Sequence, residues 1–237
     1  MFGCYTPAWV YSDVPTLEME TSRLSRGEIP LAAFVKEYGE PYSELLGIDL
    51  AGGRSREIVK WFLGAILYSK PIRESSATKT YRCFEEKGVV SAEAIVKAGW
   101  DGLVSILDAG GYTRYDFSTA DKLLEVFGNL ETLYGGDLNR LHREAKGPED
   151  LELRLKALGK GIGDTTVSIF LRDMRPIWDK ADPRPTPLVQ MAMKKLKLKD
   201  LEAFANSNGL DPVRLDTALL RLAKVFLKKN RRIRIAL

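Results

Sequence analysis

Apolar residues recur at helical spacing along almost the whole chain, and this pattern restricts the possible folds more than any other feature. In residues 55–69, for example, Ile58, Phe62, Ala65 and Ile66 fall on one face of a helix. The sequence has no sustained alternation of apolar and polar residues, which would mark half-buried strands. It therefore predicts an all-α protein with strands only as short pieces.

Glycine and capping residues divide this pattern into many helices. Ser91 is a candidate N-cap, Gly99 a candidate C-terminal stop, and Gly88 and Gly128 end two further helices. Short loops between many helices favour one compact body or two adjoining ones. The helices expected from the pattern span residues 30–40, 55–69, 74–88, 91–99, 101–111, 117–129, 150–158, 164–174, 185–196 and 211–229, whereas residues 6–15 look extended.

The composition removes several classes of protein. Cys4 and Cys83 are the only cysteines, too few for a disulfide framework or for the four thiolates of an iron–sulfur cluster. His142 is the only histidine, so a zinc site or a Ser-His-Asp triad would have to be built around it alone. No apolar run reaches membrane-spanning length, and the N-terminus does not resemble a secretory signal. We expect a cytoplasmic monomer without metal or cofactor.

Positive charge is concentrated near the C-terminus. The net charge of the chain is +4, yet residues 191–237 carry twelve Lys and Arg against four Asp and Glu. This asymmetry is consistent with a polyanionic partner. Solvated helix faces at 194–199 and a basic tail at 228–234 are the simpler explanation, so charge alone does not predict nucleic-acid binding.

A glycine-rich turn separates two helical segments in the stretch "LKALGKGIGDTTVSIFL". Gly159, Gly161 and Gly163 form the turn, and Ile162 between them is expected to fill the space between the helices. The amides of Gly161 and Gly163 would then point outward, unpaired, at the positive end of the following helix dipole. Such donors bind a phosphate oxygen without reading sequence. Asp164 is expected to cap the second helix.

A plain helical hairpin with a tight turn is the simpler interpretation of these glycines. The order Leu-x-x-Leu-Gly-x-Gly-Ile-Gly, followed by an amphipathic helix, is more specific and resembles the helix-hairpin-helix DNA-binding motif. The chain further resembles the helix-hairpin-helix DNA glycosylases, the superfamily of endonuclease III and the archaeal 8-oxoguanine glycosylases. Members carry a catalytic aspartate about twenty residues past the hairpin, and Asp182 in "ADPRPTPLV" matches it. The histidine of the usual pattern is absent, and prolines replace it.

The resemblance extends over residues 55–190. The segment 65–84 is similar to a helix-to-loop region in which many members place a glutamine that fills the space of an everted base, and Lys70 occupies that position. Residues 99–127 are similar to a second conserved stretch of the superfamily. By this resemblance Lys70 or Arg73 would enter the duplex, and the hairpin with Lys160 and the basic C-terminal segment would hold the DNA backbone.

Members of the superfamily have two helical lobes with a cleft between them. The resemblance implies a six-helix, barrel-like lobe over residues 55–168, with the helix-hairpin-helix at 151–174. Residues 1–54 and 169–237 would form the second lobe from both ends of the chain.

The implied activity is excision of a damaged or mismatched base that has been flipped out of duplex DNA. Asp182 would stabilise the positive charge that develops on the sugar and orient the attacking water. The lysine that bifunctional members use to form a Schiff base is replaced by Asp164, which favours monofunctional hydrolysis. A lyase that uses an unmatched lysine, such as Lys160 or Lys180, stays open. So does a DNA-binding module without catalysis. DNA as the partner implies a nucleoid-associated location within the cytoplasm.

Aromatic residues offer a possible base pocket. Tyr68, Tyr112 and Trp178 are the candidates, with Tyr115 as a further stacking residue, although core packing explains each of them. Arg73 and Glu74 could read a base edge. The sequence does not indicate which base is excised.

Overall fold

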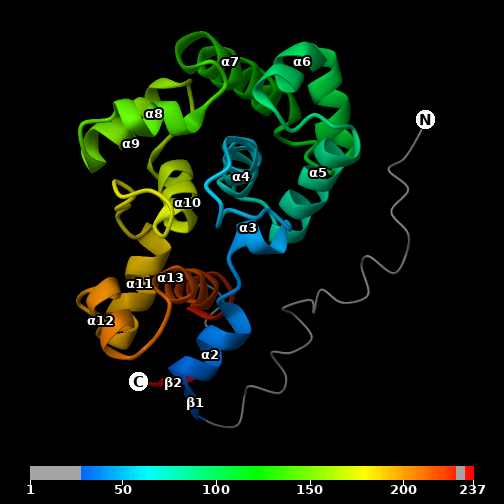
Figure 1. Ribbon diagram of the computed structural model, residues 1–237. Coiled ribbons are helices and arrows are strands. Elements are labelled where there is room, and N and C mark those ends of the chain that lie inside the picture. The colour runs from blue at the N-terminus through cyan, green and yellow to red at the C-terminus, as the bar shows by residue number, and fades with distance from the viewer. Residues whose placement is uncertain (1–27, 228–232) are drawn as a thin grey trace. The chain divides into compact units, whose positions relative to one another are not determined.

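The computed structural model describes residues 28–227 and 233–237, and over these residues it is almost entirely helical (Figure 1). The all-α prediction is therefore confirmed. Segment 6–15, expected to be extended, lies outside the described residues. The described elements, in chain order, are β1 (Glu28–Pro30), α2 (Leu31–Tyr38), α3 (Tyr42–Leu45), α4 (Ser55–Tyr68), α5 (Glu74–Glu86), α6 (Ala92–Ala109), α7 (Asp116–Tyr134), α8 (Leu138–Glu144), α9 (Pro148–Ala157), α10 (Asp164–Met174), α11 (Pro187–Leu196), α12 (Leu201–Ser207), α13 (Pro212–Arg221), the π-helical segment η3 (Leu222–Leu227) and β2 (Arg234–Ala236).

Two kinds of feature are missing from the part of the chain that the structure describes. None of its helices is both long and apolar enough to cross a lipid bilayer. Nor do three or more His, Cys, Asp or Glu side chains gather there in a way that could hold a metal ion.

The chain forms two compact units. The central unit is Tyr42–Arg184, and the terminal unit joins Met1–Pro41 to Pro185–Leu237. The central unit is thus longer at both ends than the expected lobe of residues 55–168. The reason is that the Ser43 hydroxyl donates a 2.8 Å hydrogen bond to Asp173, which ties the segment before α4 to the end of α10.

Helix α4 forms the core of the central unit. It lies in the middle of the unit in Figure 1 and packs against α3, α5, α8 and α10. Trp61 is fully buried and donates its indole N–H to the Phe170 carbonyl oxygen at 3.0 Å. The Phe62 ring packs on Phe170 and Phe127, with centroids 5.0 and 6.0 Å away. Helix α10, the second helix of the hairpin, is therefore fixed to the core.

Helix α6 contains the break that its glycine predicts. The Ser91 hydroxyl accepts a hydrogen bond from the Ala94 amide and caps the helix start. Gly99 has a φ of 67° and interrupts the helical geometry, so the expected segments 91–99 and 101–111 meet at a kink.

Helix α7 differs from the prediction at both ends. It begins at Asp116 without a side-chain cap, and it continues through Gly128 to Tyr134. Gly135, in the left-handed conformation, ends it instead. A single glycine weakens a helix by only about 1 kcal/mol. The burial of Leu130 and Tyr134 beyond Gly128 offsets this cost.

The terminal unit brings together segments from both ends of the chain. Strands β1 and β2 are parallel, with Ile29 opposite Ile235. Helix α2, expected at 30–40, packs against α13. The guanidinium of Arg221, almost fully buried, donates to the carbonyl oxygens of Tyr38 at 2.7 Å and Glu40 at 2.8 Å. These two bonds satisfy carbonyl groups at the C-terminal end of α2.

Candidate nucleic-acid interface

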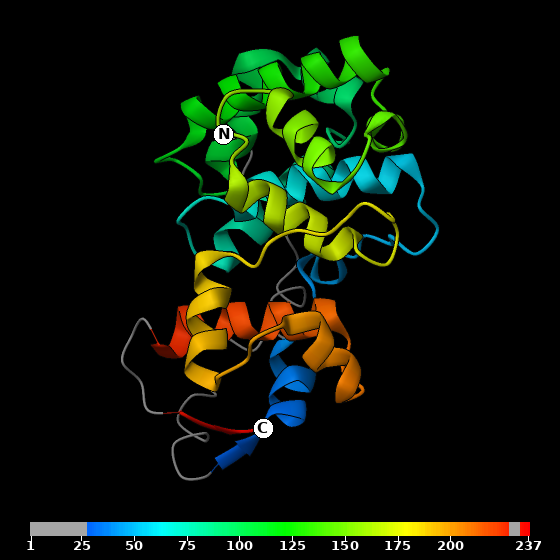
Figure 2. The same ribbon diagram turned by 90° about the vertical axis from the view of Figure 1, so that its left-hand side faces the viewer.

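The glycine-rich turn joins α9 to α10, as the sequence indicates (Figure 2). Leu155 and Leu158 are fully buried and Ile162 is 5% exposed, so all three side chains belong to the core. Lys160, Gly161 and Gly163 are exposed at the outside of the turn. Gly161 has a φ of +85°, a conformation that glycine adopts without strain.

Carbonyl oxygens of the turn accept hydrogen bonds from other parts of the protein, whereas some of its backbone amides donate none. The carbonyl oxygen of Leu158 accepts from the Asn129 side chain, and that of Gly161 accepts from Lys122 Nζ, both at 2.9 Å. Over the described residues, no acceptor is found for the amides of Gly161 and Gly163. The outer side of the turn is therefore a donor surface beside the N-terminus of α10, which suits an anion.

Close packing on α7 requires glycine at one position of the turn, Gly159. A Cβ at Gly159 would lie 2.6 Å from Val126 Cγ2 and 3.2 Å from the Val126 backbone nitrogen. A Cβ at Gly161 would lie 2.8 Å from Lys122 Cε. A Cβ at Gly163, by contrast, would meet no atom within 4 Å. Gly159 thus allows the turn to pack on α7, Gly161 lies against the Lys122 side chain, and Gly163 faces open space.

The prediction that Asp164 caps α10 was wrong. Gly163 occupies the N-cap position, and no side chain caps the helix. The Asp164 carboxylate is exposed and lies 2.7 Å from Lys156 Nζ. This lysine lowers the pKa of Asp164, with a smaller effect from Arg184. The ion pair links the two helices of the hairpin and keeps Asp164 away from its own helix start.

Asp182 lies in the loop between α10 and α11, which is anchored on both sides. The Arg175 guanidinium donates to the Pro183 carbonyl oxygen at 3.1 Å. Lys180 Nζ donates to the His142 carbonyl oxygen on α8 at 2.9 Å. Ala181 and Pro183 are buried, whereas Asp182 between them is exposed. The loop therefore presents this carboxylate outward on a fixed backbone, and Thr186, not Asp182, caps α11.

Hairpin and aspartate both belong to the central unit. Among the described residues, no hydrogen bond or ion pair joins Asp182 itself to the turn. The link that is present is electrostatic and runs from Arg184 to Asp164.

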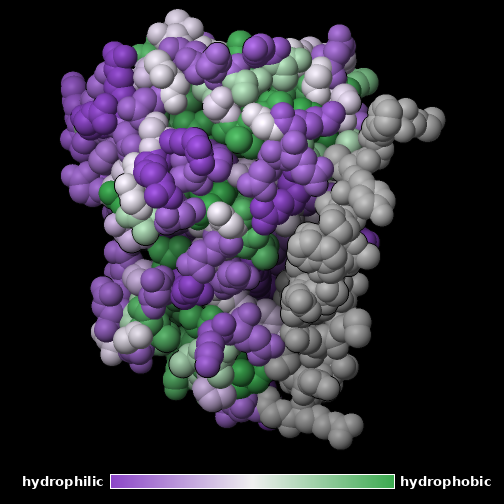
Figure 3. Space-filling model, turned by 45° about the vertical axis from the view of Figure 1, so that its right-hand side comes forward, coloured by the Kyte–Doolittle hydropathy of each residue, from purple (hydrophilic) through white to green (hydrophobic). Residues whose placement is uncertain are grey.

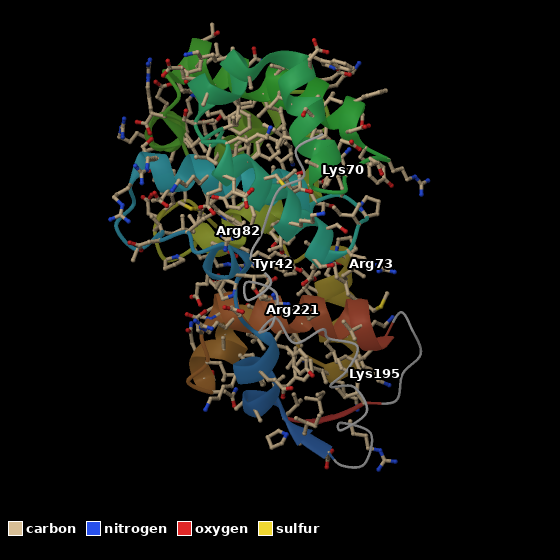
Figure 4. All side chains as sticks on the ribbon, turned by 90° about the vertical axis from the view of Figure 1, so that its right-hand side faces the viewer. Tyr42, Lys70, Arg73, Arg82, Lys195 and Arg221 are labelled. Atoms are coloured by element: carbon tan, nitrogen blue, oxygen red, sulfur yellow. The ribbon has the colours of Figure 1, made fainter. Side chains whose placement is uncertain are left out.

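The two residues expected to enter a duplex lie between α4 and α5 (Figure 4). Arg73 is exposed at the position preceding α5. Lys70 is half-buried, and its ammonium lies 5.5 Å from the centroid of the Tyr115 ring. The Arg114 guanidinium lies 5.6 Å from the same ring. Lys70 thus folds back onto the start of α7, whereas Arg73 extends from the surface.

The three residues expected to line a base pocket belong to the core. Tyr68 is 4% exposed and stacks on Tyr42, with ring centroids 4.2 Å apart. Tyr112 is 1% exposed and donates its hydroxyl to the Leu67 carbonyl oxygen at 2.7 Å. Trp178 is 3% exposed and stacks on His142. Each ring is covered by protein, because helix packing absorbs the large apolar area of aromatic side chains.

One residue of this region was not predicted from the sequence. Lys122 is 7% exposed and contacts the hairpin turn through its bond to Gly161, and nearby Lys70 contributes to lowering its pKa. The signal was present in the sequence, because Tyr115, Thr119, Lys122 and Val126 share one face of a helix. A lysine within a mostly apolar helical stripe is unusual unless its charge has a partner or a function.

Hydrophilic residues cover most of the face shown in Figure 3, with small hydrophobic areas between them. Cations near the features described above are exposed at Arg73, Arg114, Lys160 and Arg184. Together with the hairpin amides, these side chains provide positive charge and hydrogen-bond donors but no base-specific pattern.

Comparison of the chain with protein-family models, with curated proteins and with solved structures finds no match.

Proposed function

We propose that this protein binds duplex DNA through the α9–α10 hairpin and hydrolyses the N-glycosidic bond of a flipped, damaged or mismatched base. The observation that carries the proposal is the polarity of the turn. Its carbonyl groups at Leu158 and Gly161 are bonded to α7, while the amides of Gly161 and Gly163 have no acceptor among the described residues. A turn built in this way suits a phosphodiester oxygen.

The position of Asp182 supports the catalytic part of the proposal. Cleavage of a glycosidic bond develops positive charge on the sugar, and a fixed carboxylate stabilises that charge and orients the attacking water. Asp182 is exposed on a loop that Arg175 and Lys180 anchor at both sides. Its carboxylate is engaged neither as a helix cap nor in an ion pair within the described part of the chain.

A DNA-binding protein without catalysis is the second candidate. The burial of Tyr68, Tyr112 and Trp178 favours it, because these rings do not offer a surface on which a base could stack. Hairpin and basic side chains would serve this function equally well, and Asp182 would have no role in it.

Incubation of duplexes that each carry one damaged or mismatched base separates the two candidates. We expect the wild-type protein to produce strand breaks in one of them only after hot alkali, since a hydrolysed base leaves an alkali-labile site. Asp182→Asn should lower the rate by about 100-fold or more, the range for losing one preorganised electrostatic group. Binding of the duplex should be retained.

Asp101→Asn is the matched control, because Asp101 is likewise exposed but lies on α6. This variant should cleave like the wild type. Breaks without alkali would indicate a lyase that uses an unmatched lysine. Salt-sensitive binding with no breaks on any duplex would rule out excision of those bases and favour the non-catalytic protein.

A further inference from the structure

Two lysines of the central unit lie side by side next to the hairpin. Lys122 projects from α7 and is 7% exposed, and Lys70 comes from the connection between α4 and α5 and is half-buried. Lys70 Nζ lies 5.5 Å from the ring centroid of Tyr115 at the start of α7, the helix that carries Lys122, and Lys70 is close enough to lower the pKa of Lys122. Two neighbouring positive charges repel each other, and burial removes the water that would otherwise screen this repulsion.

Among the described residues, no carboxylate forms an ion pair with either lysine. Burial lowers the pKa of Lys122 to about 8, with a further contribution from Lys70, and no carboxylate opposes these effects. The other neighbours are the Gly161 carbonyl oxygen at 2.9 Å from Lys122 Nζ and the Tyr115 ring near Lys70. Thr119, one turn before Lys122 on α7, has a buried hydroxyl without a partner among the described residues.

The pair is close to the unused amides of the hairpin. Lys122 Nζ contacts the Gly161 carbonyl oxygen, and the amide of the same residue lies within about 7 Å of that ammonium by backbone geometry. An anion bound at the hairpin amides would therefore also be within reach of Lys122.

We propose that Lys70 and Lys122 form a phosphate subsite that holds the DNA strand bound by the hairpin. A phosphodiester would supply the negative charge that the pair lacks, and each ammonium would donate to a phosphate oxygen. Lys70 then acts on the backbone and not as a residue inserted between bases. The inference rests on one part of the proposed function, namely that DNA supplies the phosphate. It does not require base excision.

Proton uptake on binding provides the test. A bound phosphate favours the charged form of Lys122, so its pKa rises when DNA binds. Titration of a short undamaged duplex at pH 8, in buffers of different ionisation enthalpy, should show uptake of about half a proton by wild type beyond that of Lys122→Met. Lys70→Met and Lys122→Met should each weaken binding roughly fivefold to tenfold and lower the slope of log affinity against log salt by about one.

Lys97→Met is the matched control, because Lys97 is exposed on α6, and it should bind like the wild type. Circular dichroism establishes whether Lys122→Met folds; the half-buried Lys70 provides the second variant if it does not. Gly163→Val changes the open side of the turn. If this variant binds more weakly while both lysine variants bind like the wild type, the inference is overturned but the hairpin function stands.

Inorganic phosphate distinguishes the two sources of the anion. If phosphate raises the melting temperature only when Lys122 is present, while no duplex binds, the pair binds free phosphate and the DNA assignment is overturned. Duplex binding that depends on both lysines, with no excision of any base, would support the subsite while contradicting the catalytic proposal.

Discussion

At the scale of single residues, His142 illustrates how burial decides the role of a side chain. Its ring stacks on Trp178, with centroids 4.7 Å apart and planes within 7°. Nε2 lies 2.8 Å from Asp179 Oδ1. Burial lowers the pKa of His142, Lys180 lowers it further, and Asp179 partly opposes both effects. The imidazole is thus a packing residue that also positions the loop carrying Asp182.

This shift predicts a pH-dependent stability. The unfolded chain binds a proton near pH 6.5, whereas folded His142 binds it only at lower pH. The free energy of unfolding should therefore be highest above pH 6.5 and fall as the pH decreases through this window. Urea denaturation at a series of pH values measures the effect. Since the chain has no other histidine, His142→Gln should flatten the curve between pH 5 and pH 7; a slope that persists in the variant would contradict the assignment.

At the scale of elements, the hairpin and α7 form one packed structure. Asn129 and Lys122 bond to carbonyl groups of the turn, and Val126 fills the space beside Gly159. The glycines of the motif therefore have different tasks. Gly159 allows close approach to α7, while Gly163 leaves the outer face open.

Alanine substitutions separate these tasks. Gly159→Ala should lower the free energy of unfolding by about 1–3 kcal/mol, because its Cβ would lie 2.6 Å from Val126 Cγ2 in a packed interface. Gly163→Ala should lower it by less, at most about 1 kcal/mol, since no atom lies within 4 Å of its Cβ and only the N-cap preference for glycine is lost. Urea midpoints of the two variants provide the comparison. Equal destabilisation would mean that backbone flexibility, and not contact with α7, requires these glycines.

At the scale of the whole molecule, charge is divided unevenly along the chain. Residues 191–237, all in the terminal unit, carry a surplus of eight positive charges. Within this region Lys194, Lys195, Lys197 and Lys199 are exposed at the end of α11 and in the following loop. Figure 4 labels Lys195 among them. They are available for contact with a polyanion.

If these lysines contact DNA, changing all four to Gln should lower the salt slope of duplex binding by about 0.9 for each phosphate that is no longer neutralised. Fluorescence anisotropy at several salt concentrations measures that slope. The comparison is a variant with Gln at three lysines that are exposed in the central unit, Lys79, Lys87 and Lys97. An equal decrease per substituted lysine in both sets would indicate that total charge, and not an interaction of the terminal unit with DNA, governs binding.

Local patterns in the sequence were sufficient for much of the fold. The helical spacing predicted α4 and α10 closely, Ser91 marked the start of α6 and Gly99 its kink, and the turn glycines marked the hairpin. These features depend on residues within a few positions of one another, so periodicity and capping chemistry are enough to identify them.

Long-range packing decided the rest. The sequence alone could not distinguish a core tyrosine from a pocket tyrosine, and helices distant in the chain enclose Tyr68, Tyr112 and Trp178. Nor could it place Lys122 beside Lys70 and Gly161, since the three come from separate segments. Helical spacing specifies which face of a segment is apolar, but the partner of that face depends on how the helices of each unit pack together in its core.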